Sequence, residues 1–297
     1  MSKKMSSPPK REMAISGAHQ IFMLQLNKQK VILFSDESHK FQKCKDNSFN
    51  PIYNIADYLY LLSSGLEGNL YIESSGKNQW NKQEPSHMED IYVKFFKKRG
   101  TKQHKVNNFL VHEIDERFTT TNISDLVFNL IGKNITKSLK KLLRMIENKD
   151  FDAYKKSVDF AVDILKSKYK IIDDFLEKAL DVNFKDLLEI YEENKDEMLA
   201  EFEQIKIGEL KQINNDHVLY EFLSSFFMFL VDFTFFIHFL NSPSKLHFVF
   251  LGGKHIKNII KIFEFLGLKH SQVKILNSKG NCIQVKDLND FLNVRII

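Results

Sequence analysis

Polar side chains of the types that catalyse reactions or bind metals follow four apolar runs of the chain. They are SDESH at 35–39, ESSG at 73–76, HEIDER at 112–117 and GGKH at 252–255, and each comes at or just after the end of a run that is typical of a β-strand. In parallel sheets, functional groups collect where the strands end and the loops begin. The pattern therefore predicts that these four sets meet at one edge of a sheet.

Three of these residues form the predicted centre: His39, Glu73 and His255. Two imidazoles and a carboxylate are a usual ligand set for a divalent metal that keeps a position open for water, which predicts Zn, Mn or Co as the cofactor. The metal would lower the pKa of that water and generate hydroxide near neutral pH. Glu37 is expected beside this centre, and Arg117 is expected to stabilise charge on the attacked carbonyl or phosphoryl group.

Two other interpretations of the same residues remain open. Without a metal, a histidine would act as a general base that Glu73 orients. Alternatively, each residue has only a structural role, as a strand-end histidine or carboxylate more often does, and Ser35 or Asp36 caps a helix.

Asp232 is the third predicted catalytic residue, and it lies inside the Phe-rich segment 218–240. This segment is long enough to cross a bilayer, which takes about 20 residues. However, Glu221, Asp232 and His238 interrupt it, and a carboxylate near the centre of a span costs about 3 kcal/mol. We therefore expect a buried helix, with membrane association through 218–240 as the less favoured alternative. A buried carboxylate needs a partner, for which Arg117 or another cation is predicted.

The order of the predicted elements indicates an α/β fold. Strands are expected at 21–26, 31–34, 69–73, 108–114, 246–251, 273–276 and 282–285, and helices at 51–63, 88–97, 218–240, 254–266 and 288–294. Pro51 is expected in the first turn of its helix. Alternation of strands with helices predicts a mostly parallel central sheet flanked by helices.

The chain divides into four predicted parts. Residues 134–207 contain neither Gly nor Pro and show apolar residues at helical spacing, which predicts a helical insertion, or cap subdomain. The predicted parts are a flexible tail (1–14), a first α/β part (15–133), the helical insertion (134–215) and a second α/β part that completes the same sheet (216–297).

Composition sets limits on partners and compartment. The chain has 43 basic and 38 acidic side chains, a net charge of +5, and the two signs alternate along most of its length, so there is no specific nucleic-acid signal. Cys44 and Cys282 are the only cysteines in 297 residues, and no signal peptide opens the sequence, which predicts an intracellular, reducing compartment such as the cytoplasm. The expected partner is a small-molecule, peptide or protein substrate.

The strand-end motifs resemble those of the TraB/Tiki and erythromycin-esterase/ChaN-like superfamily. VILFSDESH places Glu37 and His39 at the positions of that family's first motif, LYIES supplies Glu73, and VFLGGKHIKNIIKIFEFLGL places His255 before a helix. Arg117 in EIDERF matches the mid-chain arginine of the family. The stretch DFTFFIHFLN is similar to segments of uncharacterised proteins of large DNA viruses.

The resemblance implies an active site at the strand ends more firmly than it implies one reaction. Its members include metal-dependent proteases and esterases, so the expected function is metal-dependent hydrolysis of a peptide or an ester. The alternative is a non-enzymatic host-interaction or binding protein that retains the fold, acting in the host cytoplasm if it is viral. Ser35, which stands where the family has glycine, favours that alternative.

Overall fold

The structure is a computed structural model of the chain. It describes residues 12–26, 28–36, 43–46, 48–73, 87–95, 103–114, 135–158, 173–204, 218–265 and 270–294.

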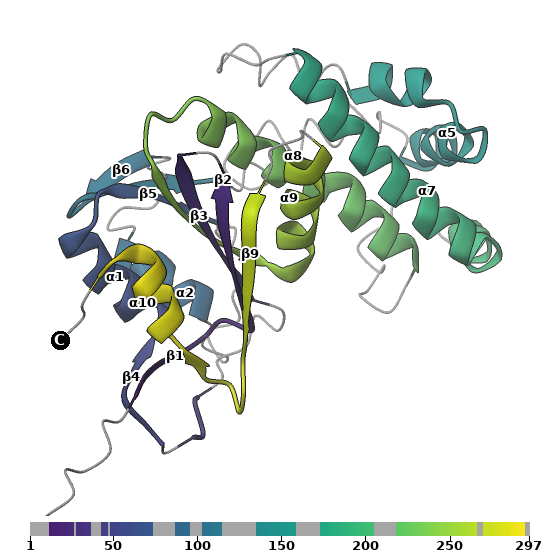
Figure 1. The fold of residues 1–297 in the computed structure, drawn as a ribbon. Helices are drawn as coiled ribbons and strands as arrows, with labels where there is room; N and C mark the ends of the chain where they lie inside the picture. Colours follow the sequence, from purple (N-terminus) through teal and green to yellow (C-terminus); the bar gives the residue numbers. More distant parts are fainter. Residues whose placement is uncertain are drawn as a thin grey trace, which may run out of the picture.

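A seven-stranded sheet forms the centre of the protein (Figure 1), with the strand order β6-β7-β5-β8-β3-β2-β9. Its strands are β2 (Gln20–Leu26), β3 (Gln29–Asp36), β5 (Gly68–Ile72), β6 (Gln103–Val106), β7 (Phe109–Glu113), β8 (Leu246–Gly252) and β9 (His270–Asn277). The four central strands β7, β5, β8 and β3 are parallel, whereas β6, β2 and β9 join the sheet antiparallel. The predicted α/β class is therefore confirmed, and the carboxyl ends of the four parallel strands share one edge.

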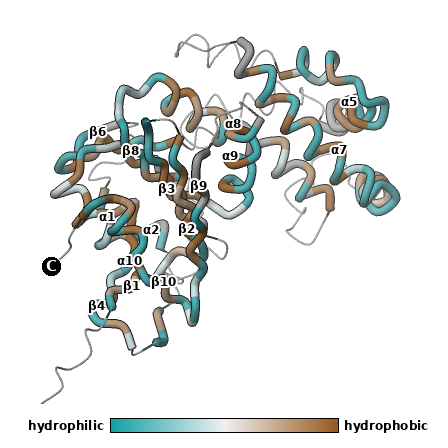
Figure 2. Tube along the Cα trace, viewed as in Figure 1, coloured by the Kyte–Doolittle hydropathy of each residue, from teal (hydrophilic) through white to brown (hydrophobic). Residues whose placement is uncertain are grey.

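The sheet separates two apolar cores because successive side chains of a strand point to opposite faces. One face carries Leu33 and Val249 and packs against α8 (Val218–Leu240) and α9 (Gly253–Phe265). The opposite face carries Phe34 and Phe248 and packs against α1 (Ile55–Gly65), α2 (His87–Phe95) and α10 (Lys286–Leu292). Figure 2 shows the apolar stretches concentrated in the sheet strands and in the helices that cover them.

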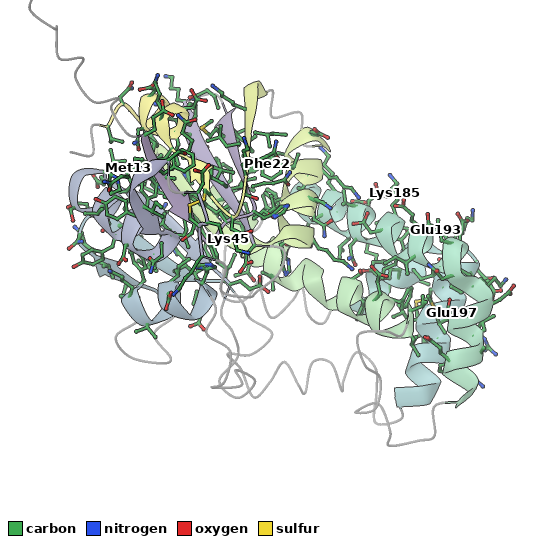
Figure 3. All side chains as sticks on the ribbon, turned by 90° about the horizontal axis from the view of Figure 1, so that it is seen from below. Met13, Phe22, Lys45, Lys185, Glu193 and Glu197 are labelled. Carbon is green, nitrogen blue, oxygen red and sulfur yellow. A yellow bond between two sulfur atoms is a disulfide. The ribbon has the colours of Figure 1, made fainter. Side chains whose placement is uncertain are left out.

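Two further helices, α5 (Ile135–Glu147) and α7 (Asp173–Gln204), lie beyond α8 and α9, on the side away from the sheet (Figure 1). Both fall within the predicted helical insertion. Figure 3 shows Phe22 projecting from the sheet toward the helices, whereas Lys185, Glu193 and Glu197 project outward from α7. These three charged side chains are exposed, so the outer surface of α7 is polar and its inner surface extends the core.

The helix α8 is buried, as the sequence predicted. Every residue from Val231 to Ile237 is buried, so this part of α8 is surrounded by protein on all sides. No helix among the described residues combines the length and the apolar character that crossing a bilayer requires.

A small second sheet corrects two predictions. It has the order β10-β1-β4 and consists of β1 (Glu12–Ser16), β4 (Phe49–Asn54) and β10 (Ile283–Gln284). Residues 12–14, predicted to end the flexible tail, belong to β1, where Ala14 pairs with Ile52 of β4 and Gln284 of β10.

Pro51 lies in β4 rather than in the first turn of a helix, so that prediction was wrong as well. The helix α1 begins at Ile55 instead, because Asn54 caps it: the Asn54 side chain accepts a hydrogen bond from the backbone N–H of Asp57. A disulfide between Cys44 and Cys282 joins the segment before β4 to the turn before β10. The disulfide does not decide the compartment, so the predicted reducing compartment stays a prediction.

Candidate acid–base site at the carboxyl edge of the sheet

The centre of the site is His255, which lies between two carboxylates. Its Nδ1 is 2.7 Å from Oδ1 of Asp232, and its Nε2 is 3.4 Å from Oε1 of Glu73. The three side chains come from three elements: Glu73 follows β5, Asp232 lies in α8 and His255 lies in the first turn of α9. The imidazole thus connects a sheet strand to both helices that cover one face of the sheet.

Glu73 is fixed by the ends of two neighbouring parallel strands. Its backbone N–H donates to the carbonyl of Phe250 in β8, and its Oε2 accepts a hydrogen bond of 3.0 Å from the backbone N–H of Gly252. Gly252 ends β8 immediately before α9 begins. The carboxylate therefore sits at the amino end of α9, where the helix dipole favours negative charge.

Asp232 is held by two residues of α9. Besides its contact with His255, it accepts a hydrogen bond of 3.1 Å at Oδ2 from the side-chain amide of Asn258. Asn258 lies three residues after His255, so both side chains emerge from the same face of α9. The two bonds use both carboxylate oxygens and fix the orientation of the imidazole through its Nδ1.

All three residues are removed from water: the exposed fractions of Asp232, His255 and Glu73 are 2%, 4% and 8%. Burial alone would lower the pKa of His255, but the negative charges of Glu73 and Asp232 and their hydrogen bonds outweigh it and raise the pKa to about 10. The imidazole is therefore a cation at neutral pH. Burial raises the pKa of Asp232, while His255 and Asn258 act in the opposite direction.

A pocket reaches this site from the side of the helical layer. It has a volume of about 260 Å³, counted with the solvent at its mouth. Its lining residues come from α7, α8 and α9 and are Ala179, Val182, Asn183, Asp186, Asp232, Phe233, Asn258 and Ile262. Of the residues described above, Asp232 and Asn258 line the pocket, whereas His255 and Glu73 do not.

The structure thus brings together three of the six predicted site residues: Glu73, Asp232 and His255. The other three, Glu37, His39 and Arg117, lie outside the described residues. Their roles, the pairing of Arg117 with Asp232 and the meeting of His39 with the other two predicted ligands stay predictions. Within the described part of the chain, the cation beside Asp232 is His255.

Two other strand-end carboxylates lie at the same edge but face away from His255. Asp36 ends β3 and Glu113 ends β7, and both are buried. Each is two residues beyond a side chain of the α1 and α2 core, Phe34 or Val111, so strand alternation points it to that face. Glu73 is two residues beyond Tyr71, which belongs to the opposite core.

The described residues do not resemble a metal centre. Among them, no three His, Cys, Asp or Glu side chains are arranged to hold a metal ion. His255 in particular has both ring nitrogens directed at carboxylates, whereas a metal ligand must offer a lone pair to the ion. The metal predicted from His39, Glu73 and His255 stays a prediction.

Asn258, His238 and His247 were not predicted from the sequence as functional residues, whereas His112 belongs to the predicted strand-end set at 112–117 without a role of its own. A signal for Asn258 was present, since a polar residue three positions after His255 must share its helix face.

The fold and the site define an α/β protein with a buried Asp–His–Glu set at the carboxyl ends of its parallel strands. The chain has no match among protein-family models, curated proteins or solved structures. The resemblance drawn from the strand-end motifs therefore stays a prediction.

Proposed function

We propose that the chain is a hydrolase that acts on an ester or peptide bond by acid–base catalysis, with His255 as the acid and Glu73 as the base. The observation that supports this most directly is the position of the His255 imidazole between Asp232 and Glu73 at the carboxyl edge of the sheet. A histidine that is charged and oriented through one nitrogen has its other N–H available for proton donation.

The two contacts of His255 differ in a way that assigns the roles. The distance to Asp232 is 2.7 Å, which is a short charge-assisted hydrogen bond, whereas the distance to Glu73 is 3.4 Å. Asp232 is therefore the positioning residue, since its bond to Nδ1 keeps Nε2–H directed toward Glu73. The reacting groups belong in the looser contact, between Nε2 and the Glu73 carboxylate.

The proposed reaction balances without a further reactant. Water attacks the carbonyl carbon while Glu73 accepts one of its protons, and a new C–O bond forms. His255 then donates the proton on Nε2 to the leaving oxygen or nitrogen as the old bond breaks. Transfer of the proton from Glu73 to Nε2 restores the starting state.

The test is hydrolysis of ester and peptide panels by the wild type and by two isosteric variants, Glu73→Gln and His255→Gln. Acid–base groups contribute about 10²- to 10⁴-fold to rate, so each variant is expected to lower kcat/KM by at least about 100-fold while its circular dichroism matches that of the wild type. Asp186→Asn is the matched control, because Asp186 lines the pocket and pairs with Lys261 but does not contact His255 in the described structure. Activity that persists in Glu73→Gln would refute the assignment of the base.

A second function is favoured by one observation: all three residues are more than nine-tenths buried. In that case the chain is a non-enzymatic binding protein, and the Asp232–His255–Glu73 set only attaches α8 and α9 to the sheet. A folded wild type that hydrolyses neither panel, combined with strongly destabilised variants, would support this alternative over the hydrolase.

A further inference from the structure

A second group of polar side chains, three of them buried and one half-buried, lies between the sheet and α8. We name it the histidine cluster, and it consists of His112 of β7, His238 of α8, His247 of β8 and Tyr71 of β5. The Tyr71 ring stacks on His112 and His247, with ring centroids 4.8 and 5.9 Å apart. The His112 and His238 rings are 4.8 Å apart. The cluster is separate from the Asp232–His255–Glu73 set, and nothing in the proposed reaction uses it.

The partners of His112 suit only its neutral form. Its Nε2 is 3.2 Å from Oδ1 of Asn69, so Nε2–H donates to that oxygen. Asn69 is oriented for this contact because its amide donates to the hydroxyl of Ser242. The other nitrogen, Nδ1, is buried and has no hydrogen-bond partner among the residues that the structure describes. A proton on Nδ1 would therefore create a buried donor with no acceptor there.

His247 is also bonded as a neutral imidazole. Its Nε2 lies 3.0 Å from the carbonyl of Ser244, to which Nε2–H donates. Its Nδ1 lies 3.1 Å from the hydroxyl of Tyr71, which donates to it. A proton on Nδ1 would remove the acceptor that this nitrogen offers to the Tyr71 hydroxyl, and it would place a positive charge in a buried site near His112.

No carboxylate among the described residues is seen to contact His112 or His247. The polar side chains of the described residues that contact these two histidines or Tyr71 are Gln29 of β3, Asn69 of β5, His238 of α8 and Ser242, and none of them is acidic. Burial, reinforced by the neighbouring histidines, lowers the pKa of His112 to about 3. Burial also lowers the pKa of His247 to about 4, although the Ser244 carbonyl opposes the shift.

The carboxyl-terminal half of α8 rests on this cluster. Phe235 meets the Tyr71 ring edge-on at 5.1 Å, and Phe239 meets the His247 ring at 4.7 Å. His238, between these two positions, approaches His112. Any separation that hydrates His112 and His247 must therefore lift this half of α8 from the sheet.

We infer that the histidine cluster is an acid-sensitive latch, which holds α8 on the sheet while His112 and His247 are neutral and releases α8 when these two imidazoles take up protons. Because the folded form binds these protons poorly and the released form binds them normally, acid favours release. Release would expose Phe235 and Phe239, which are apolar, and hydrate both imidazoles.

Native-state hydrogen exchange of the α8 amides at pH 7 and pH 5 tests this inference. For a released pKa of about 6.5, and the folded pKa values of about 3 for His112 and about 4 for His247, the equilibrium constant for opening should rise roughly 20-fold per histidine, or several hundred-fold for both. The amides of β2 and β3 should show no comparable rise if release is local.

The variants His112→Gln and His247→Gln keep a donor toward Asn69 and Ser244 but do not titrate. Each should lower the ratio of opening at pH 5 to opening at pH 7 by about 20-fold, and the ratio cancels any destabilisation common to both pH values. The exposed His19, changed to Gln, is the matched control and should keep the wild-type ratio. Three results would each contradict the latch. They are a wild-type α8 whose opening does not rise at pH 5, a double variant that keeps the wild-type ratio, and an equal loss of protection in β2 and β3. Hydrolase activity has no part in the measurement, so this inference and the proposed function fail independently.

Discussion

Replacement of Asp232 by Asn should reveal how much the buried cation of His255 contributes to stability. The substitution keeps the shape of the side chain and removes its negative charge. Oδ1 remains as an acceptor for Nδ1–H of His255, which is now 2.7 Å from that position. The substitution removes the charge that favours the protonated imidazole, which leaves Glu73 at 3.4 Å as its carboxylate partner. It also replaces Oδ2, which accepts from Asn258, by an NH2 group, so the Asn258 amide has to turn and present its oxygen.

The free energy that this cation contributes to folding follows from the pKa of His255. A rise from about 6.5 in the unfolded chain to about 10 in the folded one stabilises the folded state by about 4 kcal/mol at pH 7. Asp232 is the nearer of the two carboxylates and supplies a large share, partly offset by the cost of its own burial. We therefore expect Asp232→Asn to cost about 3 kcal/mol at pH 7, and Asp232→Ala to cost about 3–5 kcal/mol.

The raised pKa of His255 also determines how the stability changes with pH. Because the folded pKa of His255 is raised, its contribution is fully present below about pH 6.5 and is lost as the pH rises through about 10. Wild-type stability should fall over this range, and the stability of Asp232→Asn should fall less. The difference between the two proteins should therefore shrink toward zero near pH 10.

Urea unfolding followed by circular dichroism at pH 6, 7, 8, 9 and 10 measures this difference directly. Asp186→Asn serves as the control, since its ion pair with Lys261 lies nearer the surface and should be worth no more than about 1 kcal/mol. A stability difference for Asp232→Asn that stays constant from pH 6 to pH 10 would show that His255 does not carry the charge. Equal stability of the variant and the wild type at pH 7 would show that the carboxylate is solvated.

Two further predictions concern the disulfide and the close packing of two sheet strands. The Cys44–Cys282 disulfide closes a loop of 238 residues, and its reduction should destabilise the chain by about 2–4 kcal/mol. Thermal melts with and without a reductant measure this loss of stability, and an unchanged melting temperature after complete reduction would contradict the prediction. Gly68→Ala should destabilise by about 1–3 kcal/mol, because a Cβ at Gly68 would lie 2.9 Å from the carbonyl oxygen of Leu246 in β8. Gly65→Ala is the matched control, because a Cβ at Gly65 meets nothing within 4 Å. Equal free energies of unfolding for the two variants in urea titrations would refute the steric reason.

The sequence by itself determined most of the elements and their class. The apolar runs that became β2 and β3 are separated by a short polar turn, and the structure pairs them as an antiparallel hairpin. The helix predicted at 254–266 is α9, Gly253–Phe265. These predictions succeeded because strand and helix periodicity are local properties of the chain. The same is true of α8, since a helix that is apolar on all sides has to be buried.

Predictions that depended on long-range pairing were less successful. Residues 12–14 were predicted to end the flexible tail because β1 has few residues, and only the pairing of β1 with β4 and β10 makes it a strand. Pro51 was placed in a helix because proline suits a first turn, but the cap at Asn54 and the pairing of β4 with β1 start the helix later. Neither contact can be read from local sequence.

For the site, the sequence identified Glu73, Asp232 and His255 by residue type and position, but it did not predict how they combine. It predicted His255 as a metal ligand or a general base and Asp232 beside Arg117 or another cation, and the tertiary structure joins these two side chains to each other. They are 23 residues apart, on helices whose relative position depends on how α8 and α9 pack on the sheet.

Only the tertiary structure brings the members of the histidine cluster together. His112, His238 and His247 come from three elements, and no local spacing connects them. They meet because β5 lies between β7 and β8, which places Tyr71 between the two strand histidines, and because α8 crosses that face of the sheet. Strand order and helix packing are global outcomes of burying apolar surface, so the chemistry of a buried polar group depends on neighbours that are distant in the chain.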